Sequence, residues 1–489
     1  MPVPPPPPLD VDVLVVGAGV SGVDAACRLA MHCPTMAWAV LEAREAVGGT
    51  WDLFRYPGIR SDSDMYTFGF PFRPWHGEAF ATGPEIKAYV EETARHYGVT
   101  ERIHLGQRVE RLAWSSADAR WSVTASTAEG RVTHTARFVY LATGYYSYAS
   151  GHVVEFPGQA DFSGEVVHPQ QWPEGLPVAG RRVVVIGSGA TAVTLVPALV
   201  EQGAAHVTML QRSPSYVTDL PGRDVVADGL RRVLPARAAH RVVRGKNVVL
   251  STAGYQVLRR FPDAGRRLLR RRAVRRLPDG YAVDTHFAPR YDPWDQRLCV
   301  APDGDLFRVL SDGRAEVVTD TVERFERDGI RVRSGALLPA DLVVTATGLA
   351  MQIGGGAEVV VDGEPVDLSA GHVYKGLMLS DVPNAALAVG YTNASWTLRA
   401  DLSARWFCSL LRFLERKGYA VATPRYHEPP VEGEAERPLL DLTSGYVQRA
   451  AHLLPRQGRE RPWRVVQSYL YDLAVMRLGR IDDGHLELR

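Results

Sequence analysis

The sequence has 489 residues, of which 46% are hydrophobic and 23% are charged, and its formal net charge at pH 7 is +1. One compact core rarely organises so long a chain, so we expect two or three domains. The balanced charge argues against a nucleic-acid partner, and no apolar run reaches the roughly 18 residues of a membrane span. The four cysteines lack metal-site spacing, so we expect reduced thiols, no metal and a cytoplasmic protein.

The first predicted unit begins near the N-terminus. An apolar strand at residues 11–16 leads into GAGVSG at 17–22 and a helical pattern, and a second strand at 37–41 ends on an acid. This order is typical of a dinucleotide-binding βαβ unit, whose helix N-terminus faces a pyrophosphate and whose acid bonds the ribose. An acid favours an unphosphorylated ribose, as in FAD or NAD, and a turn without ligand is the alternative. The predicted cofactor residues here are Gly17, Gly19, Gly22 and Glu42.

A second unit of the same kind lies in the middle of the chain. The strand at residues 182–186 runs into GSGATA at 187–192, and an apolar helical pattern follows. Its second strand ends on an arginine and a serine instead of an acid, which suits a ribose 2′-phosphate and therefore NADPH. An exposed arginine on a turn is the alternative. The predicted cofactor residues of this unit are Gly187, Gly189, Thr191, Arg212 and Ser213.

Two further strands, at residues 137–144 and 341–348, both end in Ala-Thr-Gly. The alternation of turn and strand predicts two doubly wound, Rossmann-like α/β domains, with the NADP domain inserted in the FAD domain. The expected boundaries are 1–147 for the first part of the FAD domain, 148–345 for the NADP domain and 346–489 for the second FAD part and the C-terminal region.

An arginine-rich helical insertion is expected at about residues 216–285. Residues 259–276 alone hold nine arginines interleaved with apolar residues. We expect a solvated helix face whose arginines also pair with nearby acids; binding to a membrane surface is the alternative.

A segment between the two units makes the prediction specific. Residues 162–173 fit the pattern F-x-G-x-x-x-H-x-x-x-W-P, and residues 48–62 fit G-G-x-W, four residues, Y-P-G, three residues, D. The chain thereby resembles the type I Baeyer–Villiger monooxygenases, and specifically the subgroup of ethionamide-activating monooxygenases. In this family the first pattern links the FAD and NADP domains, and its residues here are Phe162, Gly164, His168 and Trp172.

The resemblance implies the activity and further site residues. FAD reduced by NADPH would react with O₂ to a C4a-peroxyflavin and insert one oxygen atom next to a ketone carbonyl, giving an ester or lactone, with sulfoxidation as a side activity. Arg297 matches the family's active-site arginine, and Asp62 would pair with it. The second pattern adds to the cofactor residues Gly49, Thr50, Trp51 and Asp62. Gln296 stands where many members have a lysine that helps hold the 2′-phosphate, so preference for NADPH over NADH could be weaker.

Two other functions fit parts of the sequence. A heteroatom monooxygenase acting on thioamides or sulfides shares the motifs, and a disulfide reductase or NADPH oxidase shares the two dinucleotide turns. The reductase would need a redox-active cysteine pair after the first unit, where the sequence has GGTW at residues 48–51. The small-molecule substrate and the oligomeric state are not indicated.

Overall fold

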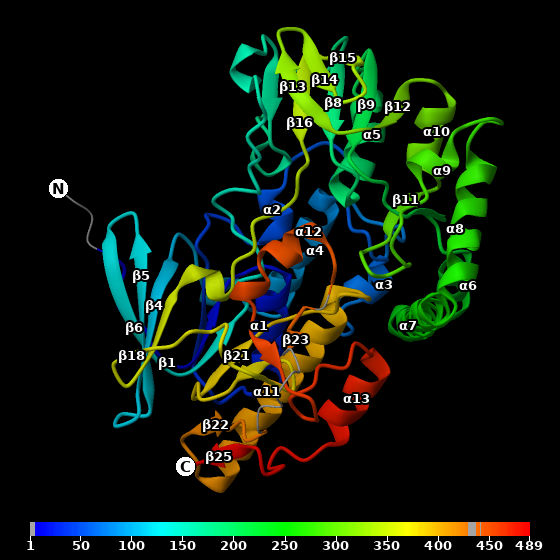
Figure 1. Cartoon of the computed structure of the whole chain (residues 1–489). Coiled ribbons are helices and arrows are strands. Elements are labelled where there is room, and N and C mark those ends of the chain that lie inside the picture. Colours follow the sequence, from blue (N-terminus) through cyan, green and yellow to red (C-terminus); the bar gives the residue numbers. More distant parts are fainter. Residues whose placement is uncertain (1–4, 429–436, 441) are drawn as a thin grey trace. The chain divides into compact units, whose positions relative to one another are not determined.

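Internal contacts divide the chain into two units, which the computed structural model describes over residues 5–428, 437–440 and 442–489 (Figure 1). Unit 1 comprises Met1–Asp52, Ile86–Ser147 and Met351–Arg489, and unit 2 comprises Leu53–Glu85 and Tyr148–Ala350. This division differs from the predicted boundaries mainly in residues 53–85, which belong by their contacts to unit 2.

Unit 1 is built on one large sheet. Its parallel part contains β1, with β2 and β6 on either side of it. Strands β4, β5 and β6 pair antiparallel in the same sheet. Among the described residues, nine strands join this sheet: β1 (Asp10–Val16), β2 (Trp38–Leu41), β3 (Ile103–His104), β4 (Arg108–Ser115), β5 (Arg120–Thr127), β6 (Gly130–Leu141), β17 (Glu358–Val361), β18 (Glu364–Pro365) and β21 (Ala385–Leu387).

Helices α1 and α11 pack together in unit 1. Arg28 of α1 forms a buried ion pair with Asp401 of α11, which ties the first and last thirds of the chain. The helices that lie at least partly in this unit are α1 (Val20–His32), α2 (Thr50–Leu53), α4 (Gly83–His96), α11 (Trp396–Lys417), α12 (Gly445–Arg449) and α13 (Tyr469–Leu478). Its two-stranded pairs are β19 (Val373–Tyr374) with β20 (Met378–Leu379), β22 (Ala422–Pro424) with β25 (Leu486–Leu488), and β23 (Arg437–Pro438) with β24 (Arg456–Gln457).

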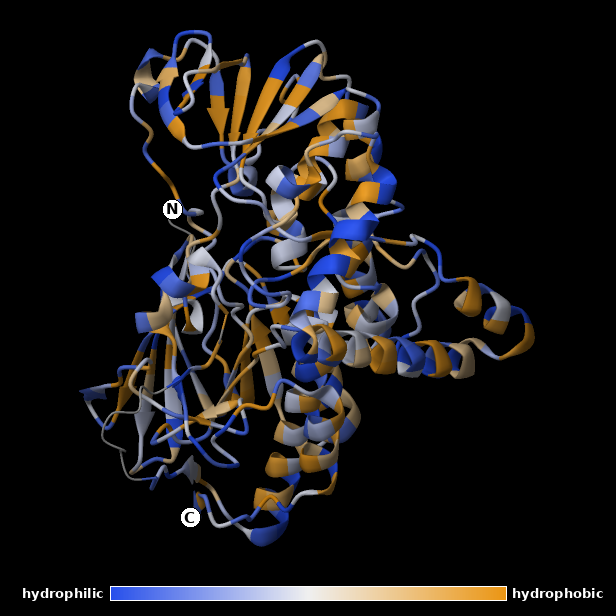
Figure 2. Cartoon of the chain, turned by 45° about the vertical axis from the view of Figure 1, so that its right-hand side comes forward, coloured by the Kyte–Doolittle hydropathy of each residue, from blue (hydrophilic) through white to orange (hydrophobic). Residues whose placement is uncertain are grey.

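Unit 2 is built on a parallel sheet of order β12-β9-β8-β16-β7. Its middle strands are buried and apolar, as expected where a parallel sheet is covered on both faces, and Figure 2 shows them mostly in the hydrophobic colour. The strands are β7 (Glu165–Val167), β8 (Arg182–Ile186), β9 (His206–Gln211), β12 (Ala315–Thr319) and β16 (Leu342–Thr345). The predicted α/β fold class is therefore confirmed.

The predicted helical insertion is present in unit 2. It contains α6 (Val225–Val233), α7 (Ala236–Arg260), α8 (Pro262–Arg276) and α9 (Val283–His286). Its first residues form a strand, β10 (Val217–Leu220), which pairs with β11 (Cys299–Pro302). Other elements of the unit are α3 (Met65–Phe68), α5 (Ala190–Glu201), α10 (Asp305–Ser311), β13 (Val322–Glu326), β14 (Gly329–Val332) and β15 (Leu337–Pro339).

Candidate functional site

The first glycine-rich turn joins β1 to α1 in unit 1. Gly17 has φ +103°, a backbone conformation that favours glycine. A Cβ at Gly22 would lie 1.8 Å from the carbonyl oxygen of Gly17, so α1 approaches the turn more closely than any side chain allows. Gly19 is the N-cap of α1 and has no side chain that could cap the first N–H groups of the helix. The first N–H groups of α1 are thus available to a phosphate.

Glu42 lies directly after β2 and is buried. Its two carboxylate oxygens accept hydrogen bonds from the backbone N–H groups of Ala18 at 2.6 Å and Arg44 at 2.9 Å. Burial raises its pKa, and these two bonds oppose that rise. Each carboxylate oxygen has a second lone pair, so Glu42 can hold the glycine-rich turn and still accept a ribose hydroxyl.

The GGTW segment is fixed by a charge cluster that the sequence motifs do not contain. The Asp52 carboxylate bonds Arg44 at 2.5 Å and Lys87 at 2.8 Å, with 4% of its side chain exposed. Burial acts to raise the pKa of Asp52, but the bonds from Lys87 and Arg44 outweigh it and lower the pKa. Thr50 accepts a hydrogen bond from the Tyr146 hydroxyl at 2.5 Å. These contacts therefore hold in place the segment that contains the predicted residues Gly49, Thr50 and Trp51.

The second turn joins β8 to α5 in unit 2. Gly187 has φ +144°, and a Cβ at Gly189, the N-cap of α5, would meet nothing within 4 Å. The helix thus opens onto space that a phosphate can occupy. Arg212 and Ser213 follow β9 with exposed side chains. The Ser188 hydroxyl donates to the Ser213 carbonyl at 3.1 Å, which joins the turn to the end of the second strand.

Residues 53–85 pack on this second turn because their aromatic and small residues fit α5. Tyr56 is buried, burial raises its pKa to about 12, and its hydroxyl bonds the Thr191 side chain. Gly58 has φ +75°, and a Cβ there would lie 2.7 Å from the Ala198 side chain of α5. Arg60 forms an ion pair with Asp305 of α10 at 2.5 Å. The side chain of Thr191, a predicted cofactor residue, is therefore bonded to another residue of this chain. No sequence pattern indicated that Asp305 is an ion-pair partner of this segment.

The structure brings Asp62 and Arg297 together, although they are 235 positions apart. A guanidinium nitrogen of Arg297 lies 3.3 Å from an oxygen of Asp62, and about a third of each side chain is exposed (32% and 33%). Both residues belong to unit 2. The pair places a permanent cation, partly accessible, on loops next to the second dinucleotide turn.

The fingerprint residues lie beside the edge strand β7. Phe162 packs edge-on against Phe325, with ring centroids 5.8 Å apart. The His168 imidazole accepts a hydrogen bond at Nδ1 from the N–H of Gln170, and burial lowers its pKa. A Cβ at Gly151 would lie 2.0 Å from that ring.

Two more fingerprint residues complete the segment. Gly164 leaves room for the Phe162 ring, and Trp172 packs against the core of unit 2. These contacts give the four residues a structural role within unit 2, and their part in domain coupling stays a prediction.

Two other kinds of site are absent over the described ranges. No helix there is long and apolar enough to cross a membrane. No group of three or more His, Cys, Asp or Glu side chains is arranged to hold a metal ion in that part of the chain.

Comparison with known proteins agrees with this architecture. A family model described as pyridine nucleotide-disulphide oxidoreductase matches residues 71–229, and one described as NAD(P)-binding Rossmann-like domain matches residues 15–90. A structure of oxidised steroid monooxygenase bound to NADP superposes with a TM-score of 0.75 at 21% identity, covering 98% of this chain and 99% of the other. At that identity the likeness shows the fold.

Curated relatives are more similar in sequence. The FAD-containing monooxygenase EthA of Mycobacterium tuberculosis (strain ATCC 25618 / H37Rv) is 50% identical over 474 residues, which is 97% of this chain and 96% of the relative. The putative FAD-containing monooxygenase MymA of the same strain is 47% identical over 487 residues, with the same coverage. The predicted enzyme class and flavin cofactor agree with these relatives, and the chain belongs to the family of FAD-containing monooxygenases.

Proposed function

We propose that this protein is an FAD- and NADPH-dependent Baeyer–Villiger monooxygenase, which converts ketones and O₂ into esters or lactones and oxygenates sulfur as a side activity. The observation that carries the proposal is the ion pair of Asp62 and Arg297. An arginine held by a carboxylate, accessible and next to a dinucleotide turn, suits stabilisation of a reacting oxygen that carries negative charge.

The residues present fit both cofactors. In unit 1, the open α1 N-terminus suits the FAD pyrophosphate and Glu42 suits its ribose. In unit 2, the space in front of Gly189 suits the NADPH pyrophosphate, and the exposed Arg212 suits its 2′-phosphate. Bound FAD, once reduced by NADPH, supplies the activation of O₂.

The chain's own residues provide the electrostatics. Arg297 keeps its positive charge at every working pH and so favours the unprotonated, nucleophilic form of the reacting oxygen. Asp62 orients the guanidinium through its 3.3 Å contact.

Oxygenation of thioamides or sulfides without useful ketone activity is the second candidate. It is favoured by the 50% identity to EthA over nearly the whole chain, together with the resemblance to the ethionamide-activating subgroup. The Asp62–Arg297 pair is compatible with both functions, so product analysis has to separate them.

The test is to incubate the FAD-loaded enzyme with NADPH, ¹⁸O₂ and panels of ketones and sulfides, and to identify products by mass spectrometry. We expect one ¹⁸O atom in an ester or lactone. Arg297→Ala should reduce ester formation by about 100-fold, as removal of a preorganised stabilising donor does. Arg290→Ala is the matched control, because Arg290 is exposed on the same loop. Labelled sulfoxide alone would establish the second candidate, and peroxide without labelled product would refute both.

A further inference from the structure

The Asp62–Arg297 contact by itself does not hold in place the two loops that carry these residues. It is a single contact at 3.3 Å between side chains that are each about one third exposed. Exposed ion pairs of this kind contribute little free energy. Asp62 lies outside any helix or strand, and so does Arg297. Whatever fixes the two loops therefore fixes the pair.

The loop of Asp62 is held by helix α7. Two positions after Asp62, Asp64 caps α3 and accepts a hydrogen bond from the Asn247 side chain at 2.9 Å. Arg244 is buried, and its Nη1 donates to three backbone carbonyls at the end of α3: those of Tyr66 at 2.8 Å, Thr67 at 3.0 Å and Gly69 at 2.7 Å. A cation at a helix C-terminus satisfies carbonyls that otherwise lack partners.

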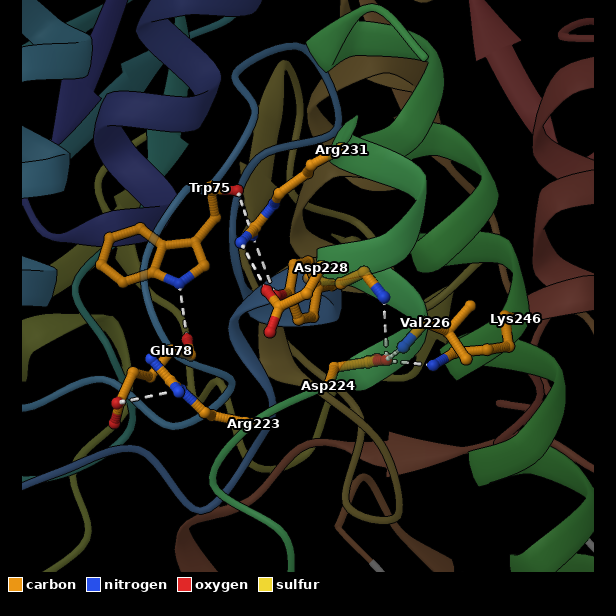
Figure 3. A network of polar contacts seen from close by, with 10 residues as sticks. Trp75, Glu78, Arg223, Asp224, Val226, Asp228, Arg231 and Lys246 are labelled. Atoms are coloured by element: carbon orange, nitrogen blue, oxygen red, sulfur yellow. Dashed lines mark hydrogen bonds and ion pairs between the residues drawn. The ribbon is translucent and has the colours of Figure 1, made fainter. Parts of the chain in front are cut away.

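Helix α6 strengthens this attachment. Its Arg231 donates to the Tyr66 hydroxyl at 2.9 Å and to the Trp75 carbonyl at 3.1 Å. Lys246 of α7 bonds Asp224, the N-cap of α6, at 2.5 Å. Figure 3 shows this network, with Arg231 directed at Trp75 and Lys246 directed at Asp224. The chain after Asp62 is thus tied to two helices of the insertion.

The loop of Arg297 is held by the other end of α7. Arg259, in the last turn of α7, bonds Asp295 at 2.6 Å, and Arg266 of α8 bonds Asp292. Tyr255 packs edge-on against Trp294, with ring centroids 5.5 Å apart.

Trp294 itself shows how tightly this loop is determined. Its φ of +75° is a left-handed conformation that a bulky residue keeps only when its surroundings impose it. Arg297 follows three positions later. The contacts from α7 and α8 hold this shape together with the local turn from Asp292 to Asp295 and the hydrogen bond that the Tyr216 hydroxyl donates to the Tyr291 carbonyl.

The contacts that α7 itself makes with the two loops come from one side of this helix. At about 100° per residue, Arg244, Asn247, Tyr255 and Arg259 fall within an arc of about 120°, and Asn247 and Arg259 are separated by about 18 Å along the axis. We propose that α7 is a brace that holds Asp62 and Arg297 at their working separation, with Arg244, Asn247 and Arg259 as positioning residues. This inference rests on the proposed function for its chemical meaning and on the contacts alone for its geometry.

Arg259→Gln is the test at the Arg297 end, and Arg260→Gln is its matched control, since Arg260 is exposed on the same turn. In the FAD-loaded enzyme we expect amide hydrogen exchange over residues 287–298 to become about threefold faster in Arg259→Gln, because the Arg259–Asp295 side chains are 43% and 31% exposed and such a pair contributes up to about 1 kcal/mol. We expect kcat for oxygenation to fall about tenfold, since misplacement by 1 Å costs up to about 100-fold. The KM for NADPH should stay unchanged. Arg259→Lys should restore most of the rate.

Two further variants separate a brace from general damage. Asn247→Ala, which leaves the buried Arg244 in place, should speed exchange over residues 60–70. In an Asp62→Asn background, Arg259→Gln should cause no additional loss of oxygenation, because the pair that it positions is already broken.

Three results would overturn the brace: unchanged exchange over residues 287–298, equal effects of Arg259→Gln and Arg260→Gln, or a full additional loss in the Asp62→Asn background. If the unmodified enzyme oxygenates nothing, the proposed function fails. Hydrogen exchange still tests whether α7 acts as a brace.

Discussion

At the level of one side chain, we expect Arg212 to decide which nicotinamide cofactor is used. It is exposed after β9, where a 2′-phosphate is expected. Arg212→Ala should raise the KM for NADPH about tenfold or more, with little change for NADH, because only the former loses a charge-assisted bond. Steady-state kinetics with both cofactors checks this. Equal changes for both would show that Arg212 does not hold the 2′-phosphate.

Single residues also show what sequence patterns can indicate. Glu42 was predicted from motif spacing, and Asp62 and Arg297 from the family resemblance; the structure pairs Asp62 with Arg297, and the functional roles of all three stay predictions. The charges that hold them were not predicted: Asp52 pairs with Lys87, and Arg60 pairs with Asp305. Such partners are distant in sequence and follow no period, so only the folded chain reveals them.

At the scale of elements, α7 contains a pH-dependent contribution to stability. His240 is buried in α7, and burial, with the nearby charge of Arg244, lowers its pKa to about 4 from 6.5. Between these pH values the unfolded chain binds a proton that the folded chain does not. Stability is therefore highest above pH 6.5 and falls toward pH 4, by about 3 kcal/mol, since one pKa unit corresponds to about 1.4 kcal/mol.

Urea unfolding at pH 7 and pH 4.5 measures this dependence. His240→Leu should flatten the difference, while His452→Leu, at an exposed position, should leave it unchanged. An equally steep dependence in His240→Leu would show that the proton binds elsewhere.

Elements with a strong periodic pattern were predicted well, among them α1 and α5. Strand β10 was not predicted. Its partner β11 is some 80 positions away, and its own four residues lie in a region dominated by helix formers. The expectation that arginines of residues 259–276 pair with local acids is met by Arg259, Arg266, Arg270 and Arg276. Membrane-surface binding remains an untested alternative.

For the whole molecule, the two units predict two separable responses to ligands. FAD should stabilise unit 1 and NADP⁺ should stabilise unit 2, because a ligand that binds only the folded form raises its stability. At about 100 times Kd, each should raise the Tm of its unit by about 5 °C in calorimetry of FAD-free protein. If both ligands shift one common transition by the same amount, the units unfold together.

The architecture as a whole was predictable because two copies of one turn pattern alternate with two matching strands. This order indicates that one dinucleotide-binding domain is inserted in the other. The assignment of residues 53–85 to unit 2 was not predictable, since it depends on how Tyr56 and Gly58 fit against α5. The predicted cofactor assignment of each unit, like the cytoplasmic location, stays a prediction.

The path of the chain has a consequence for synthesis on the ribosome. Unit 2 ends at Ala350, whereas unit 1 takes its last segment from Met351–Arg489. Arg28 of α1 finds its buried partner, Asp401, only after more than 370 further residues have been made. Unit 2 can therefore complete its fold while unit 1 is still an open sheet with an uncovered helix. Nascent chains that stall before α11 should present that apolar surface to chaperones. Truncation of the C-terminal segment should disrupt unit 1, whose first strand is made first, and should leave unit 2 intact.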